Sequence, residues 1–123
     1  MDLERKARLV QFLYEAQLIG FTDDQLHNHA PIINLSFADL SGAHLDYANL
    51  SGAHLGFADL GGAQLYHAHL GFAQLSYADL SYADLGYADL SGANLRESKV
   101  TLQQLAQAFS LEGTIMPKGS KHP

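Results

Sequence analysis

The chain has 123 residues, the length of one small domain, and leucine and alanine dominate its apolar content. Lysine and arginine total 7 against 13 aspartates and glutamates, so the formal net charge is −6. This balance argues against direct nucleic-acid binding and leaves a basic partner open. The absence of cysteine excludes disulfides, thiolate zinc sites and cysteine nucleophiles. No apolar run is long enough to predict a membrane span.

Residues 1–31 are expected to form an N-terminal helical cap. Apolar residues recur at helical spacing over residues 3–19, with Asp2 as the expected N-cap and Gly20 as the stop. Thr22 and Gln25 have the spacing of a capping box and predict one more short turn. The first residues lack the apolar segment of a signal peptide, which gives the expectation of a cytoplasmic protein.

An unbroken five-residue repeat occupies the middle of the chain. Leucine stands at every fifth position from Leu35 to Leu95, and alanine stands two positions before leucine from Ala38 to Ala93. A period of five gives a helix no apolar stripe, because each step rotates the side chain by about 140°. The same period sends successive leucines to opposite faces of a continuous strand. The repeat therefore predicts short extended Ala-x-Leu units that are joined by two-residue corners.

The residues between these units are typical of turns. Pairs such as Ser41-Gly42 and Gly61-Gly62 stand at the corners, and no proline lies between Pro31 and Pro117. Every backbone N–H in the repeat is therefore available to bond a neighbouring coil. We expect the chain to coil around its own leucines.

Segments such as Ala-Asp-Leu-Ser-Tyr and Ala-Asn-Leu-Ser-Gly resemble the pentapeptide-repeat proteins. The resemblance implies an all-β fold, a right-handed quadrilateral β-helix with four pentapeptides, or twenty residues, per coil. Residues twenty apart would then align in ladders. Residues 32–100 would then form a little over three coils. The flanking segments are similar to the capping segments of cyanobacterial members. Because both repeat columns are unbroken, an engineered origin stays open beside a natural one.

Residues 101–123 are expected to form a C-terminal helical cap and a polar tail. Thr101 and Gln104 have capping-box spacing and predict a helix that contains Leu102, Leu105, Ala106 and Phe109. A β-helix exposes an apolar, unpaired end, so both flanking segments are interpreted as covers for the coil ends. Partner recruitment or dimerisation by the first helix is the alternative.

The residues that face outward from the coils define a candidate interaction surface. Between residues 33 and 95 the chain carries aspartates but no lysine or arginine, and its aromatic residues stand at corners. Stacking between coils is the structural interpretation of the corner rings, and an interface, including a homodimer face, is the functional one. The candidate residues are Asp39, Asp59, Asp79, Asp84, Asp89, Tyr77, Tyr82 and Tyr87.

The sequence favours a non-catalytic structural or protein-interaction scaffold with an unknown protein partner. A coil filled with leucine and alanine leaves no substrate pocket, so neither catalysis nor a cofactor is expected. No metal site is expected either, because His67 and His69 alone make a poor ligand set. Membrane binding is also not expected. The family resemblance implies the alternative, an acidic mimic of DNA that binds or inhibits DNA gyrase or another topoisomerase.

Overall fold

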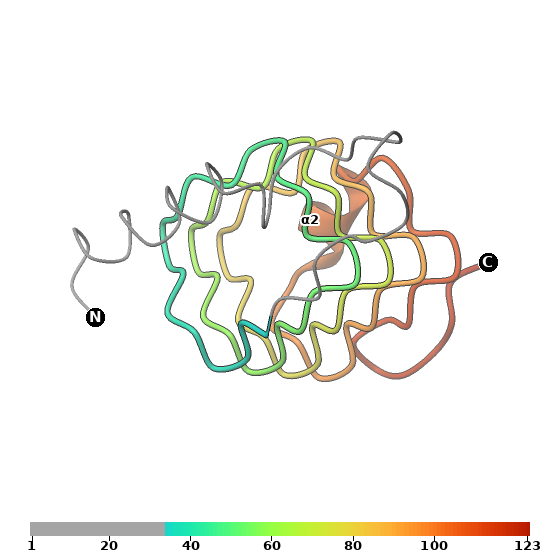
Figure 1. Cartoon of the computed structure of the whole chain (residues 1–123). Helices are drawn as coiled ribbons and strands as arrows, with labels where there is room; N and C mark the ends of the chain where they lie inside the picture. Colours follow the sequence, from blue (N-terminus) through green and yellow to red (C-terminus); the bar gives the residue numbers. More distant parts are fainter. Residues whose placement is uncertain (1–33) are drawn as a thin grey trace, which may run out of the picture.

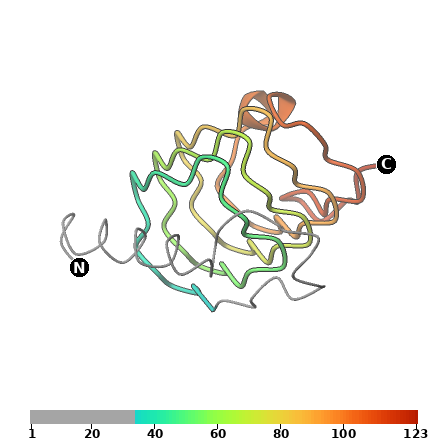
Figure 2. The same ribbon diagram turned by 45° about the horizontal axis from the view of Figure 1, so that its top comes forward.

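The computed structural model describes residues 34–123, which form a stack of coils closed by a C-terminal segment (Figure 1). Each coil takes twenty residues and makes four single-residue parallel bridges to the next, so it has four sides. The rotated view shows the coils stacked in register along one axis (Figure 2). The four ladders that this register creates are Asn34–His54–Gln74–Asn94, Asp39–Asp59–Asp79–Lys99, His44–Gln64–Asp84 and Asn49–His69–Asp89. The predicted alignment on a period of twenty is therefore confirmed.

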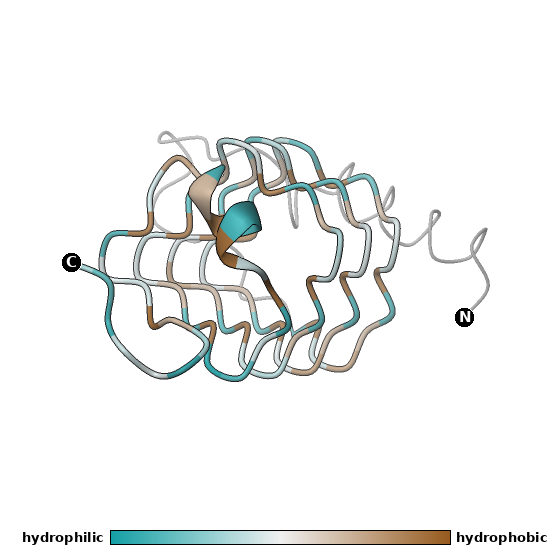
Figure 3. Ribbon diagram, turned by 180° about the vertical axis from the view of Figure 1, so that it is seen from behind, coloured by the Kyte–Doolittle hydropathy of each residue, from teal (hydrophilic) through white to brown (hydrophobic). Residues whose placement is uncertain are grey.

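Leucine and alanine fill the coil because both ends of each Ala-x-Leu unit point inward. Leu40 to Leu95 are at most 2% exposed, and the alanines from Ala43 to Ala93 are all buried. The residue between them points outward, so apolar and polar residues alternate along each coil (Figure 3). Ser98 continues the alanine column and is 8% exposed, and its hydroxyl has no hydrogen-bond partner within the described residues.

Each corner is a turn in which the alanine N–H donates to the preceding leucine carbonyl. The bond from Ala43 to Leu40 measures 3.0 Å, and the same bond recurs around the coils. The second corner residue adopts the left-handed conformation, with a φ of 68° at Gly42 and 60° at Phe57. Glycine adopts this conformation freely, whereas the aromatic residues at the same position are held there by the coil.

Backbone hydrogen bonds join successive coils in two directions. The N–H of Leu60 donates to the carbonyl of Asp79 at 2.7 Å, and the N–H of Asp79 donates back to Ala58 at 2.9 Å. Leucine N–H groups thus point toward the C-terminal end of the stack. These single bridges replace longer strands, because each side of a coil is only three residues wide.

The chain leaves the coil after Val100 and forms α2 (Leu102–Ala106), visible against the end of the stack in Figures 1 and 3. Thr101 and Gln104 form the predicted capping box, and Leu105 is buried against the core. The prediction that Phe109 belongs to this helix is wrong. The helix ends at Ala106, and the N–H of Phe109 instead donates to Ala88, which returns the chain to the coil.

The predicted N-terminal cap over residues 1–31 lies outside the described residues. The boundaries placed at residues 31 and 100 stay predictions. Within residues 34–123, no helix has the length and apolar character needed to cross a membrane.

Candidate interaction surface

The aspartates and asparagines that precede the core leucines support the corners of the coil. The carboxylate of Asp59 accepts the N–H of Gly61 at 2.9 Å, and the amide oxygen of Asn49 accepts that of Ser51 at 3.1 Å. Side chains of this type close a local turn onto their own backbone. The same bond is made by all five candidate aspartates: Asp39, Asp59, Asp79, Asp84 and Asp89.

The structure distributes these aspartates over three sides of the stack. Asp39, Asp59 and Asp79 form one ladder, which Lys99 completes at the C-terminal end. Asp84 lies on the next side, at the end of a ladder of histidine and glutamine. Asp89 lies on the side after it, where it follows asparagine and histidine and is bridged onward to Ser110. The candidate residues thus form one acidic ladder and a band around the last complete coil. The band consists of Tyr77, Asp79, Tyr82, Asp84, Tyr87 and Asp89.

The corner before the acidic ladder carries a stack of three rings. Phe37 and Phe57 have centroids 5.0 Å apart, and Phe57 and Tyr77 have centroids 4.7 Å apart. The rings are parallel within 5° in both pairs. The predicted stacking between coils is confirmed here, although Tyr77 remains 53% exposed.

A second ring cluster occupies the corner before Asp89. His67 lies between the parallel rings of Tyr47 and Tyr87, with centroids 5.0 and 5.1 Å away. Tyr66 meets the edge of this stack and has its centroid 4.4 Å from that of His67. The sequence interpretation missed Tyr66. Its signal was Gly86, one coil later, where a Cβ would lie 3.0 Å from the Tyr66 ring.

Tyr82 and Phe72 make no ring stack within the described part of the chain. Tyr82 occupies the corner that Gly42 and Gly62 occupy in the two preceding coils, so it has no ring to stack on. It is 94% exposed. Phe72 lies over Gly92, where a Cβ would be 2.6 Å from its Cε1 atom. The stacking interpretation therefore applies to Phe57, Tyr77 and Tyr87 but not to these two rings.

Asp79 is held in its charged form. The Ser81 hydroxyl and the Ser81 backbone N–H, followed by the nearby charge of Lys99, lower the pKa of Asp79 from its ordinary value of 3.8. Hydrogen bonds to the charged form and an opposite charge both favour ionisation. The Asp79 carboxylate, where the acidic ladder meets the last complete coil, is therefore negatively charged near neutral pH.

The histidines do not form a ligand cluster in residues 34–123, where no group of three or more metal-binding side chains occurs. His67 is enclosed by the tyrosine stack, while His69 lies exposed on the adjoining side. His44 instead shares a 2.8 Å hydrogen bond between its Nδ1 and the side-chain oxygen of Gln64 in its own ladder. His44 and His67 thus contribute side-chain contacts between coils.

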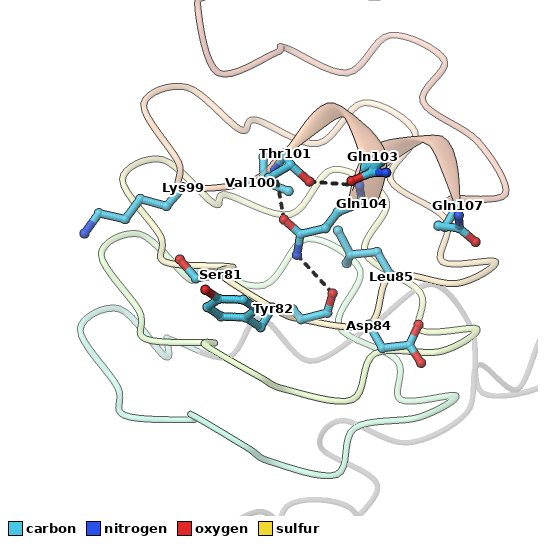
Figure 4. Close-up of a pocket in the computed structure, with 11 residues that line it drawn as sticks. Ser81, Tyr82, Asp84, Leu85, Lys99, Val100, Thr101, Gln103, Gln104 and Gln107 are labelled. Atoms are coloured by element: carbon cyan, nitrogen blue, oxygen red, sulfur yellow. Dashed lines mark hydrogen bonds between the residues drawn. The ribbon is translucent and has the colours of Figure 1, made fainter.

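A groove lies between α2 and the last coil (Figure 4). Its volume is about 640 Å³, and its walls include Tyr82, Asp84 and Lys99 from the coil and Gln103 and Gln107 beside them. Gln104 reaches across one end, where its Nε2 donates to the carbonyls of Leu80 and Ala83 at 2.7 and 3.0 Å. Two of the candidate residues, Tyr82 and Asp84, therefore line a shared recess.

Four bridged sides, an inward Ala-x-Leu column and turns at every fifth residue define a β-helical repeat protein. The chain belongs to the pentapeptide repeat family, whose sequence model matches residues 33–71 and 73–101 in eight copies. The relatives of known structure are described as pentapeptide repeat proteins, and the family implies a right-handed β-helix.

A pentapeptide repeat protein from Nostoc PCC 7120 is 38% identical to this chain, with a TM-score of 0.56. The match covers 69% of this chain and 65% of that one, so this chain spans about two-thirds of that relative. HetL from the same cyanobacterium, involved in heterocyst differentiation regulation, is 34% identical over 72% of this chain and 53% of its own, with a TM-score of 0.39. The first of these two relatives indicates a cyanobacterial-type member.

A pentapeptide repeat protein of the Arabidopsis thaliana thylakoid lumen is 28% identical, with a TM-score of 0.48. This match covers 79% of the present chain and 68% of the Arabidopsis chain. No curated protein matches the sequence.

Proposed function

We propose that the protein is a non-catalytic scaffold that binds a protein partner through the band around its last complete coil. The observation that supports this most is the alternation of exposed tyrosines and aspartates on successive corners and sides. Tyr77, Tyr82 and Tyr87 are 53%, 94% and 58% exposed. Asp79 lies between the first two rings along the chain, and Asp84 lies between the second and third. Tyrosine is enriched at interfaces, and carboxylates beside it suit a partner with basic groups.

The rigid coil favours this use. Both the leucine below each side and the hydrogen-bonded turn at each corner fix the backbone that carries the rings. A surface that is already ordered loses little conformational entropy when it binds. Catalysis is not part of the proposal, because the coil interior is filled by leucine and alanine, and the polar side chains of the repeat lie on its convex outside. We propose that the protein binds its partner in the cytoplasm.

Affinity capture with chemical cross-linking from a cyanobacterial extract tests the proposal. The Tyr82→Gly/Tyr87→Gly variant removes one unstacked ring and one ring at the end of a stack. The matched control Phe37→Gly/Phe72→Gly removes the same two kinds of ring from outside the band. We expect a saturable partner that the control retains and the tyrosine variant loses. Equal capture by both variants, or no saturable partner, would contradict the proposal.

The acidic ladder favours a second candidate, an acidic mimic of DNA that binds a topoisomerase. Asp39, Asp59 and Asp79 repeat at the separation of adjacent coils, about 4.8 Å. Their hydrogen bonds to the corners give these carboxylates a structural role as well, which makes the mimic the weaker candidate. A supercoiling assay with purified DNA gyrase separates the two functions. Inhibition that is lost in Asp39→Asn/Asp59→Asn would favour the mimic, and no inhibition at high excess would exclude it.

A further inference from the structure

Two backbone N–H groups at the groove have no acceptor among residues 34–123. Around the last coil, the N–H groups of the core leucines and of the second corner residues donate to the chain that follows. This holds for Leu75, Tyr77, Leu80, Tyr87, Leu90, Gly92, Leu95 and Glu97. Tyr82 and Leu85 are the two exceptions. Both line the groove beside α2.

The exception arises because α2 replaces the next coil along this side. The bridge from Asp79 to Lys99 spans twenty residues, whereas that from Asp89 to Ser110 spans twenty-one. The chain therefore takes one extra residue to pass this side as a helix. It rejoins the coil where the carbonyl of Gln107 accepts the N–H of Tyr87 at 2.8 Å. The N–H groups of Tyr82 and Leu85 therefore face the groove and not the backbone of a following coil.

The preceding coil shows what these N–H groups bind when a chain covers them. At the same positions, Gly62 donates to the carbonyl of Ser81 at 2.7 Å, and Leu65 donates to that of Asp84 at 2.9 Å. The two acceptors are carbonyls three residues apart on one chain. The free N–H groups of Tyr82 and Leu85 thus have the spacing that matches a short peptide segment.

The acceptors on this open side are already occupied. The Gln104 side-chain amide donates to the carbonyls of Leu80 and Ala83, the second of which would otherwise receive a backbone N–H from the next coil. In the preceding coil that position is filled by the bond from Asp84 to Ala63. The groove therefore offers a ligand backbone hydrogen-bond donors but few free backbone acceptors.

Charge distinguishes a neutral ligand from an anion. Lys99 and Asp84 both line the groove, so their charges offset each other, and the coil carries further aspartates nearby. A carboxylate or phosphate would meet this net acidic surface, whereas an uncharged carbonyl would not. The exposed ring of Tyr82 adds an apolar surface beside the two donors. The groove volume of about 640 Å³ lies within the usual range of ligand pockets.

We propose that this groove binds an uncharged peptide segment of a partner protein, whose backbone carbonyls three residues apart accept the N–H groups of Tyr82 and Leu85. The inference rests on the proposed scaffold function and assigns a chemistry to one part of the partner. An extended chain added at an open side of the coil would be held mainly by main-chain hydrogen bonds.

The test is titration of the ¹⁵N-labelled full chain with acetyl-Ser-Tyr-Ala-Asn-amide, followed by NMR. This probe copies residues 81–84 with asparagine in place of the aspartate, so it carries no charge. We expect saturable downfield shifts of the Tyr82 and Leu85 amide protons, together with slower exchange of both with solvent. Absent shifts at millimolar probe, or shifts confined to other residues, would overturn the proposal.

Two variants make the result specific to the groove. Gln103 is exposed and lines the groove, so Gln103→Trp should fill it and abolish the probe-induced shifts. Ala106→Trp adds the same side chain to α2 at an exposed position outside the groove lining and should leave them unchanged. Shifts that persist in Gln103→Trp would overturn the assignment. If the probe fails to bind while partner capture is still lost in Tyr82→Gly/Tyr87→Gly, only the groove proposal fails, and the scaffold function stands.

Discussion

The ring of Tyr77 lies parallel to that of Phe57, with the centroids 4.7 Å and the planes 3° apart. Phe57 also stacks on Phe37, so its ring has a partner on each face. Both Phe57 and the unstacked Tyr82 have φ near 60°. The two corner residues therefore share a backbone conformation but differ in ring stacking. They also differ in a backbone bond, because the N–H of Phe57 donates to Ser76 and that of Tyr82 has no acceptor among residues 34–123.

The difference in stacking predicts unequal effects of glycine at the two corners. Tyr82→Gly relieves a left-handed residue, which offsets the extra flexibility of glycine in the unfolded chain. We expect its unfolding free energy to be unchanged or raised by up to about 1 kcal/mol. Phe57→Gly also loses two ring contacts and should be about 1–3 kcal/mol less stable than Tyr82→Gly. Urea denaturation measures both, and equal destabilisation would show that stacking contributes nothing.

Gln104 is expected to be more sensitive to substitution than its neighbour Gln103. Its side chain bonds the carbonyls of Leu80 and Ala83 and completes the capping box with Thr101. Gln104→Ala leaves two part-buried carbonyls without this donor and should cost about 1–3 kcal/mol. The exposed neighbour Gln103 has no such bond, so Gln103→Ala should change stability by less than about 0.5 kcal/mol. A similar cost for both would contradict the role given to Gln104.

Asp59 tests whether the ladder aspartates serve the corner or the charge. Asp59→Asn keeps an oxygen that accepts the Gly61 N–H, whereas Asp59→Ala removes it. We expect the asparagine variant to unfold like the wild type and the alanine variant to lose about 1 kcal/mol. Thermal denaturation at neutral pH distinguishes them. Equal losses in both variants would mean that the charge, rather than the hydrogen bond, stabilises the turn.

The lowered pKa of Asp79 predicts that this residue contributes to the loss of folding stability in acid. Because the fold lowers the pKa of Asp79 below 3.8, its carboxylate stabilises the folded state above that pH. This contribution is lost as the pH falls through the lowered pKa. Ser81→Ala removes the hydroxyl that is the largest cause of the shift, so its stability deficit should shrink in acid. Denaturation as a function of pH checks this, and a deficit independent of pH would contradict it.

The coil could be predicted from the sequence because one local rule repeats. An inward leucine and alanine at fixed spacing leave a single way to bury both columns, which is to coil the chain around them. The resemblance added the twenty-residue period, the four sides and the hand of the helix, which spacing alone does not determine. The ladder partners of Asp59 and the stacking of Phe57 on Tyr77 follow from that period.

The end of the coil could not be predicted in the same way. Leu105 and Phe109 have helical spacing, yet the helix ends at Ala106. The N–H of Phe109 donates to the carbonyl of Ala88 in the coil instead. Tertiary pairing there outweighs local pattern. The open N–H groups of Tyr82 and Leu85 depend on how α2 passes this side, which no local sequence pattern shows. Tyr66 was missed because its contact depends on Gly86 in another coil.

The most direct test of partner binding is the affinity of the captured partner for the wild type and for the two double variants. If Tyr82 and Tyr87 are central to the interface, Tyr82→Gly/Tyr87→Gly should weaken binding at least about tenfold. The control Phe37→Gly/Phe72→Gly should bind like the wild type. An affinity that is unchanged in the tyrosine variant would contradict a scaffold that binds through the band around its last coil.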